Sequence, residues 1–133
     1  MMEKKPRKLL GTANFGMPYG LANRHKQISH HLASDIIQLA LEEGFVGLDT
    51  AQAYGNAEEL IGENLGLLKP KMIVTKISEV RDGYDLDGFR EKLNYSIKRL
   101  GRQPDVVFFH SSKFLRRFKT KEVQSIQAYM LEK

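Results

Sequence analysis

The chain has 133 residues, which is enough for one domain with a sizeable hydrophobic core. Hydrophobic residues make up 41% of it and charged residues 28%, as in ordinary globular proteins. No apolar run is long enough to span a membrane and no charged-then-apolar leader is present, so we expect a soluble, cytoplasmic protein. There are no cysteines, which excludes disulfides and thiolate metal sites and fits a reducing compartment.

The formal net charge of +5 suggests affinity for an anion, such as nucleic acid, a membrane surface or a phosphorylated cofactor. Much of the excess lies in two runs, Lys4 to Lys8 and Arg116 to Lys121. Runs of this kind are more often solvated than specific, and no RNA- or DNA-reading motif surrounds them. Nucleic-acid binding is therefore the weakest of the functional hypotheses.

Short apolar runs alternate with helical patterns along the whole chain. The runs predicted as strands are 9–15, 45–49, 71–76 and 105–110, and the predicted helices are 30–43, 57–68, 86–100 and 121–132. This alternation favours a parallel sheet with helical crossovers. The consecutive apolar residues at 106–109 are typical of strands covered on both faces.

Polar residues and glycines mark the expected ends of these helices. The expected N-caps, in chain order, are Ser29, Asn56, Asp85 and Thr120. Gly44 and Gly101 are the expected stops after the first and third predicted helices.

Four side chains capable of acid–base or hydrogen-bonding chemistry stand at or just past predicted strand ends: Asp49, Tyr54, Lys76 and His110. In a barrel of parallel strands, this is the face on which chemistry is done. Each residue alone has a more common structural explanation. The aspartate suits a turn or cap, the tyrosine a packing role, the lysine a solvated surface, and the histidine a hydrogen-bonded strand end.

Other types of site find little support. Gly11 and Gly16 do not form a G-x-G-x-x-G dinucleotide loop. The adjacent His30 and His31 point to different faces of a helix, so we predict no metal site. No zinc-protease motif, P-loop or nucleophile elbow is present.

Taken in order, the motifs resemble the N-terminal half of an aldo-keto reductase, a TIM (β/α)8 barrel that uses a nicotinamide cofactor. The similarity covers nearly all of the chain, and its motifs are residues 10–16, 49–51 with Tyr54-Gly55, Glu58 and Ile61-Gly62, Thr75-Lys76, 96–101 and 105–110. The expected fold class is therefore α/β, a parallel half-barrel of about four βα units. Residues 1–133 would form a single incomplete domain.

The resemblance implies a catalytic tetrad of Asp49, Tyr54, Lys76 and His110, and NADP(H) as cofactor. Tyr54 would act as general acid/base on the oxygen of an aldehyde or ketone, and His110 would orient that oxygen. A free phenol has a pKa of about 10, and the ammonium group of Lys76 would favour its phenolate. Asp49 would hold Lys76 charged. Gly11 and Thr12 would approach the nicotinamide by their backbone, beside Asp49.

Four strands cannot close a barrel, so the first and fourth would remain as edges. We expect side chains near Leu10, Val46, Val74 and Val107 to be exposed on the inner face. The chain would then dimerise, bind a complementary half-barrel or aggregate. Because the family's other contacts to the cofactor lie mostly in the second half, the alternative is a non-catalytic half-barrel, a truncated remnant or interaction module without cofactor binding.

Overall fold

The computed structural model of the chain describes residues 7–20, 27–79, 86–115 and 119–132. Its centre is one four-stranded sheet in the order β1-β2-β3-β4, and each neighbouring pair is parallel. The strands are β1 (Leu9–Gly11), β2 (Gly47–Asp49), β3 (Met72–Ile77) and β4 (Val106–Phe109). The expected α/β half-barrel of four βα units is confirmed.

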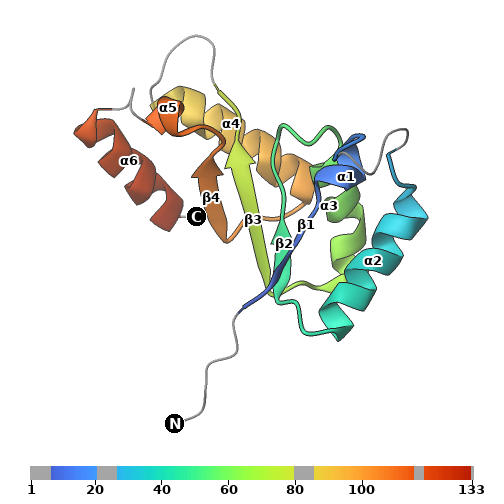
Figure 1. Ribbon diagram of the computed structural model, residues 1–133. Coiled ribbons are helices and arrows are strands. Elements are labelled where there is room, and N and C mark those ends of the chain that lie inside the picture. The colour runs from blue at the N-terminus through green and yellow to red at the C-terminus, as the bar shows by residue number, and fades with distance from the viewer. Residues whose placement is uncertain (1–6, 21–26, 80–85, 116–118, 133) are drawn as a thin grey trace.

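Helices connect the strands and cover one side of the sheet. They are α1 (Ala13–Gly16), α2 (His30–Glu42), α3 (Ala57–Leu68), α4 (Leu86–Leu100), α5 (Ser112–Leu115) and α6 (Thr120–Leu131). Figure 1 shows α3 and α4 behind the sheet, with α6 at the β4 end. Within the described residues, every helix is too short or too polar to cross a membrane.

The core lies between the sheet and its helices. Leu48 and Ile73, which are neighbours in the strand register, are both fully buried and pack with α2 and α3. A second cluster joins Ile77 at the end of β3 to Phe89 and Leu93 of α4 and Ile126 of α6. Alternate strand residues therefore face the helices, which leaves the other strand positions for the inner face of the half-barrel.

The first strand is shorter than predicted. The apolar run 9–15 was expected to be one strand, but β1 ends at Gly11 and α1 follows. The chain turns because the backbone N–H of Phe15 bonds to the carbonyl of Thr12 at 2.9 Å. This turn carries the Phe15 side chain into the first core cluster, so tertiary packing overrides the apolar pattern.

Predicted helix ends are partly confirmed. Ser29 caps α2, accepting the backbone N–H of Leu32 at 3.2 Å, and the glycines after α2 and α4 have positive φ. Asn56 makes no capping bond, and its Oδ1 accepts from Gln27 Nε2 at 2.7 Å instead. The N-cap of α6 is Lys119 rather than Thr120. Asp85 lies outside the described residues.

The expectation for the inner face needs correction. Leu10 and Val107 pack against the two core clusters on the helix side, and Val74 is only 4% exposed. The large apolar side chain that is open on β4 is Phe108, which is 54% exposed. The prediction assigned Leu10 and Val107 to the wrong face. Val74 shares a face with Lys76 but is buried there, and Val46 is partly buried.

The two outer strands are edges, as expected. β1 pairs only with β2 and β4 only with β3 among the described residues. Strands at the edge of a sheet are the usual place for pairing with a further strand.

Candidate active site

The four predicted catalytic residues converge at the carboxyl edge of the sheet. Asp49 is the last residue of β2, Lys76 is the penultimate residue of β3, and His110 directly follows β4. Tyr54 lies in the segment 50–56 between β2 and α3. Parallel strands direct their carboxyl ends to one side, so four separate parts of the sequence meet there.

Lys76 is held by two acceptors from the β2 side. Its Nζ donates to Asp49 Oδ1 in an ion pair and to the Thr50 carbonyl oxygen at 3.1 Å. The side chains of Lys76 and Asp49 are 22% and 40% exposed, so the pair is only partly shielded from water. These contacts fix the direction in which the ammonium group points.

The phenol ring of Tyr54 lies near both Lys76 and His110. Lys76 Nζ is 5.3 Å from the ring centroid. The His110 ring meets Tyr54 edge-on, with centroids 6.4 Å apart and an interplanar angle of 82°. A phenol, an ammonium and an imidazole thus share one small volume, in which a carbonyl oxygen could meet a proton donor and a second hydrogen-bond donor.

Gly11 and Thr12 lie beside Asp49. Thr12 is buried, and both its N–H and its hydroxyl donate to the Asp49 carbonyl oxygen, at 3.0 and 3.1 Å. Gly11 pairs with Asp49 in the strand register, and among the described residues other than its chain neighbours none has an atom within 4 Å of where its Cβ would be. The open backbone at Gly11 fits the close approach of a flat ring such as nicotinamide.

A close backbone contact supports the segment that carries Tyr54. A Cβ on Gly16 would lie 1.6 Å from the Tyr54 carbonyl oxygen, so only glycine allows α1 to approach this closely. The same carbonyl accepts the N–H of Ala57 at 3.0 Å, and the N–H of Tyr54 donates to the carbonyl of Ala51, also at 3.0 Å. The backbone of Tyr54 is therefore fixed on both sides.

Sequence reasoning assigned no role to several residues that the fold brings to this region. The exposed Tyr19 ring lies 6.4 Å from the Tyr54 ring, between centroids. Two residues of α4 bond to the segment 50–56: Ser96 accepts a hydrogen bond from Gln52, and Arg99 donates one to the Gly55 carbonyl oxygen. Glu58 was noted only as part of a motif and as a first-turn acid favoured by the helix dipole, which gives no sign of its burial.

Neither histidine at the start of α2 takes part in a metal cluster. His30 Nδ1 lies 3.1 Å from Glu63 Oε2, and His31 Nδ1 lies 3.0 Å from Asp35 Oδ2. Across the described ranges there is no group of three or more His, Asp or Glu side chains placed to hold a metal ion.

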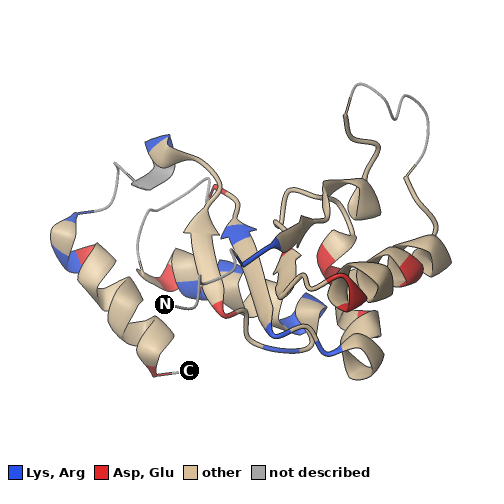
Figure 2. Cartoon of the chain, turned by 60° about the horizontal axis from the view of Figure 1, so that its bottom comes forward, with Lys and Arg blue, Asp and Glu red and all other residues tan. Residues whose placement is uncertain are grey.

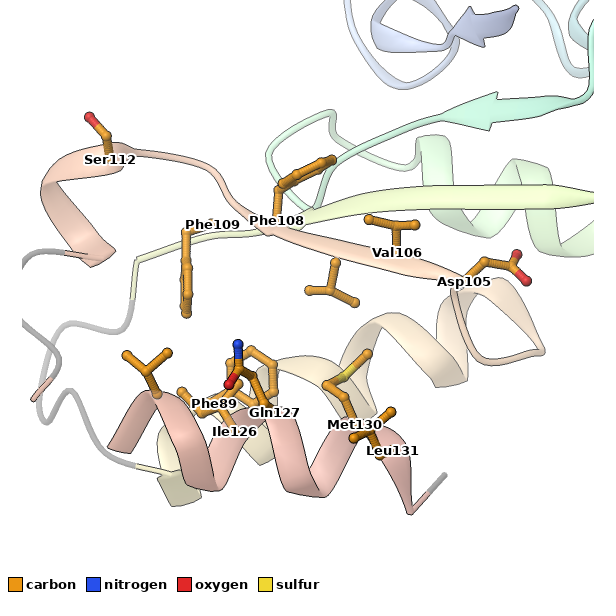
Figure 3. A pocket seen from close by; sticks show the side chains of 12 residues that line it. Phe89, Asp105, Val106, Phe108, Phe109, Ser112, Ile126, Gln127, Met130 and Leu131 are labelled. Atoms are coloured by element: carbon orange, nitrogen blue, oxygen red, sulfur yellow. The ribbon is translucent and has the colours of Figure 1, made fainter. Parts of the chain in front are cut away.

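A large cavity lies away from the quartet, meaning Asp49, Tyr54, Lys76 and His110. It has a volume of about 860 Å³ and opens between β4 and α6. Figure 3 shows apolar side chains of both elements facing each other across it, among them Phe109, Ile126 and Met130. This β4–α6 groove borders the free edge of β4, and none of the quartet lines it.

Positive charge is scattered in the described structure. Figure 2 shows Lys and Arg on strands, helices and loops, with acidic residues among them. Residues 4–6 of the first basic run and 116–118 of the second lie outside the described residues. The described surface thus adds no support to nucleic-acid binding.

Comparison with known proteins identifies relatives. The sequence profile of the Aldo/keto reductase family matches residues 9–127. A protein of Pseudomonas aeruginosa assigned to the aldo-keto reductases has a similar structure, at 27% identity and a TM-score of 0.72, over 90% of this chain. An aldo-keto reductase of Klebsiella pneumoniae, solved in complex with NADPH, matches 96% of this chain with 20% identity and a TM-score of 0.69. No curated protein sequence matches.

The match is to part of each relative. The chain spans 50% of the Pseudomonas protein and 42% of the Klebsiella protein. The residues matched by the family profile, 9–127, include all four parallel strands and the four residues of the quartet. With the family profile covering most of the sequence, the chain belongs to the aldo/keto reductase family.

Proposed function

We propose that this chain carries the proton-transfer half of an NADP(H)-dependent carbonyl reductase site, which reduces aldehydes or ketones to alcohols. The observation that supports this most is the placement of Lys76. Its ammonium group is paired with Asp49 and faces the ring of Tyr54, which in turn meets His110 edge-on. Membership of the family supports the same reaction class.

In the proposed reaction, Tyr54 donates its phenolic proton to the substrate oxygen as negative charge develops there. Lys76 stabilises the resulting phenolate, and Asp49 keeps the ammonium group charged and directed. His110 donates a hydrogen bond to the same oxygen and orients the carbonyl. Gly11, Thr12 and Asp49 are the residues of this chain that would hold the nicotinamide end of the cofactor. The bound cofactor supplies the hydride.

The proposed enzyme needs a second group of βα units. Four strands leave β1 and β4 as open edges in the described structure, and closure of a barrel needs about eight. We propose that a complementary half-barrel or a second copy of this chain covers these edges. The partner would complete the cofactor site, because the quartet would contact only the reactive end of the cofactor.

The alternative is a non-catalytic half-barrel that serves as an interaction module. The observation in its favour is that β1 and β4 each have a single partner strand among the described residues. Under this alternative, the four residues of the quartet would be retained from the family but would catalyse no reaction. The lack of cysteines suits a reducing compartment, and we propose a cytoplasmic location under either reading.

Titration of the purified chain with NADPH, followed by cofactor fluorescence, separates the two proposals. Native mass is recorded on the same sample to establish the assembly state. Saturable binding together with aldehyde-dependent oxidation of NADPH supports the reductase. A folded sample that binds no cofactor, alone or mixed with a complementary half-barrel, supports the interaction module.

A further inference from the structure

A fully buried carboxylate stands directly behind the candidate active site. Glu58, in the first turn of α3, has no exposed surface. Its Oε1 accepts two hydroxyl groups, from Thr75 at 2.7 Å and from Ser96 at 2.8 Å. Its Oε2 lies 3.5 Å from Arg99 Nη1, so that contact is an ion pair rather than a hydrogen bond. Burial of an ionised group is unfavourable unless such partners compensate it.

Two partners of Glu58, Thr75 and Arg99, are adjacent in sequence to a proposed catalytic residue or bond to the backbone next to one. Thr75 immediately precedes Lys76 on β3. The guanidinium of Arg99 donates to the carbonyl oxygen of Gly55, which immediately follows Tyr54. One carboxylate is thus connected, through one side chain on each branch, to the chain neighbours of both members of the Tyr54–Lys76 pair.

Ser96 provides a third branch to the same segment. Its hydroxyl accepts from Gln52 Nε2 at 2.8 Å while it donates to Glu58. Gln52 precedes Tyr54 by two residues, and its Oε1 accepts the N–H of Ser78 at 3.0 Å, just past the end of β3. The segment 50–56 is therefore tied to β3 and α4 on both sides of Tyr54.

We propose that Glu58, together with Arg99, is a positioning pair that sets the phenol of Tyr54 against the ammonium group of Lys76. Neither residue belongs to the quartet, and neither is assigned contact with substrate or cofactor. The consequence for catalysis rests on the proposed function, but the placement itself can be measured without any activity. The charge on Glu58 matters because it holds Arg99 where the guanidinium reaches Gly55.

The neighbouring Glu59 provides a matched control. Its Oε1 lies 3.4 Å from Nε of the same arginine, but its side chain is 53% exposed, and no hydrogen bond ties it to β3 or α4 in the described structure. Glu58→Gln and Glu59→Gln make the same chemical change, one residue apart, next to the same guanidinium. A purely electrostatic effect on Arg99 would appear in both variants, whereas the positioning role predicts an effect of Glu58 alone.

The test is NMR of the full chain with isotopically labelled tyrosine and histidine rings, in which Tyr54→Phe identifies the Tyr54 signals. Wild type should show a cross-peak between the Tyr54 and His110 rings, because they meet edge-on. In Glu58→Gln we expect shifted Tyr54 signals and a cross-peak weakened about twofold, which corresponds to a displacement of about 0.5 Å. In Glu59→Gln the Tyr54 signals and the intensity of the cross-peak should match those of wild type.

Arg99→Lys keeps the positive charge but removes the guanidinium fork that reaches Gly55, and it should move the Tyr54 signals in the same direction. If Glu58→Gln fails to fold, Arg99→Lys alone tests the positioning role. Tyr54 signals identical to wild type in folded Glu58→Gln or in Arg99→Lys would overturn the proposal, as would equal shifts in Glu59→Gln. If the NMR result is positive and NADPH still does not bind, the positioning pair stands and the reductase proposal fails.

Discussion

Lys76 faces Tyr54 with its ammonium nitrogen 5.3 Å from the ring centroid, while the same nitrogen donates to Asp49 and to the Thr50 carbonyl. Two of the three contacts come from the carboxyl end of β2, and the ammonium group itself comes from β3. The relationship therefore depends on the register between β2 and β3, which pairs Asp49 with Val74, two residues before Lys76. In a strand, residues two apart lie on the same face, which places Asp49 and Lys76 on one surface of the sheet.

Removal of the phenol hydroxyl tests the proposed proton donor. Tyr54→Phe should lower carbonyl reduction by about 10²–10⁴-fold, the usual contribution of a general acid, and leave NADPH affinity nearly unchanged. The measurement is steady-state NADPH oxidation with an aromatic aldehyde, alongside fluorescence titration of the cofactor. Tyr95→Phe is the control, because Tyr95 lies on α4 and is exposed. Equal losses in the two variants would contradict the assignment.

The ion pair of Lys76 and Asp49 should matter more for activity than for stability. Both side chains are partly exposed, and pairs of this kind contribute about 0–1 kcal/mol. We therefore expect Lys76→Met to reduce turnover by about 10²-fold or more, because the phenolate of Tyr54 loses its cation. Chemical denaturation should show a change of no more than about 1 kcal/mol in the free energy of unfolding. A large loss of stability with unchanged turnover would assign the pair a structural role instead.

Much of the fold could be predicted from the sequence because helical periodicity and strand–helix alternation are local patterns. The bounds of α3 and α4 agree with the predicted ranges 57–68 and 86–100. The predicted length of the first strand was wrong for a non-local reason, since Phe15 packs into a core cluster with residues of α2 and α3. The quartet could be found because parallel strands direct their ends to one edge. The burial of Glu58 could not be predicted, because the sequence pattern of a first-turn glutamate is the same whether its side chain faces water or bonds to Thr75.

The contact between α1 and the Tyr54 segment should tolerate no side chain at Gly16. An added Cβ would overlap the Tyr54 carbonyl oxygen, so the backbone must move, and overpacking of this kind costs about 1–3 kcal/mol or more. We expect Gly16→Ala to lower the midpoint of thermal unfolding and to disturb Tyr54. Gly66→Ala is the matched control, since in the described part of the chain nothing beyond the adjacent helix backbone and its chain neighbours lies within 4 Å of its Cβ position on α3. There alanine should raise stability by about 0.5–1 kcal/mol. A Gly16→Ala protein as stable as wild type would show that α1 and the Tyr54 segment do not pack this closely.

Exposure of Phe108 should control association of the chain. This aromatic is 54% exposed on β4, whose outer edge has no partner strand in the described structure, and it lines the apolar β4–α6 groove. Open strand edges beside apolar surface promote pairing with other chains, so we expect the wild type to be an oligomer at micromolar concentration. Phe108→Glu should shift it toward monomer by placing a charge in the contact, and sedimentation velocity would measure the shift. Leu67→Glu is the control, because Leu67 is 83% exposed on α3 and does not line the groove. If Leu67→Glu dissociates the oligomer while Phe108→Glu does not, the association surface lies on the helical side. That result would contradict the proposal that a partner covers the edge of β4.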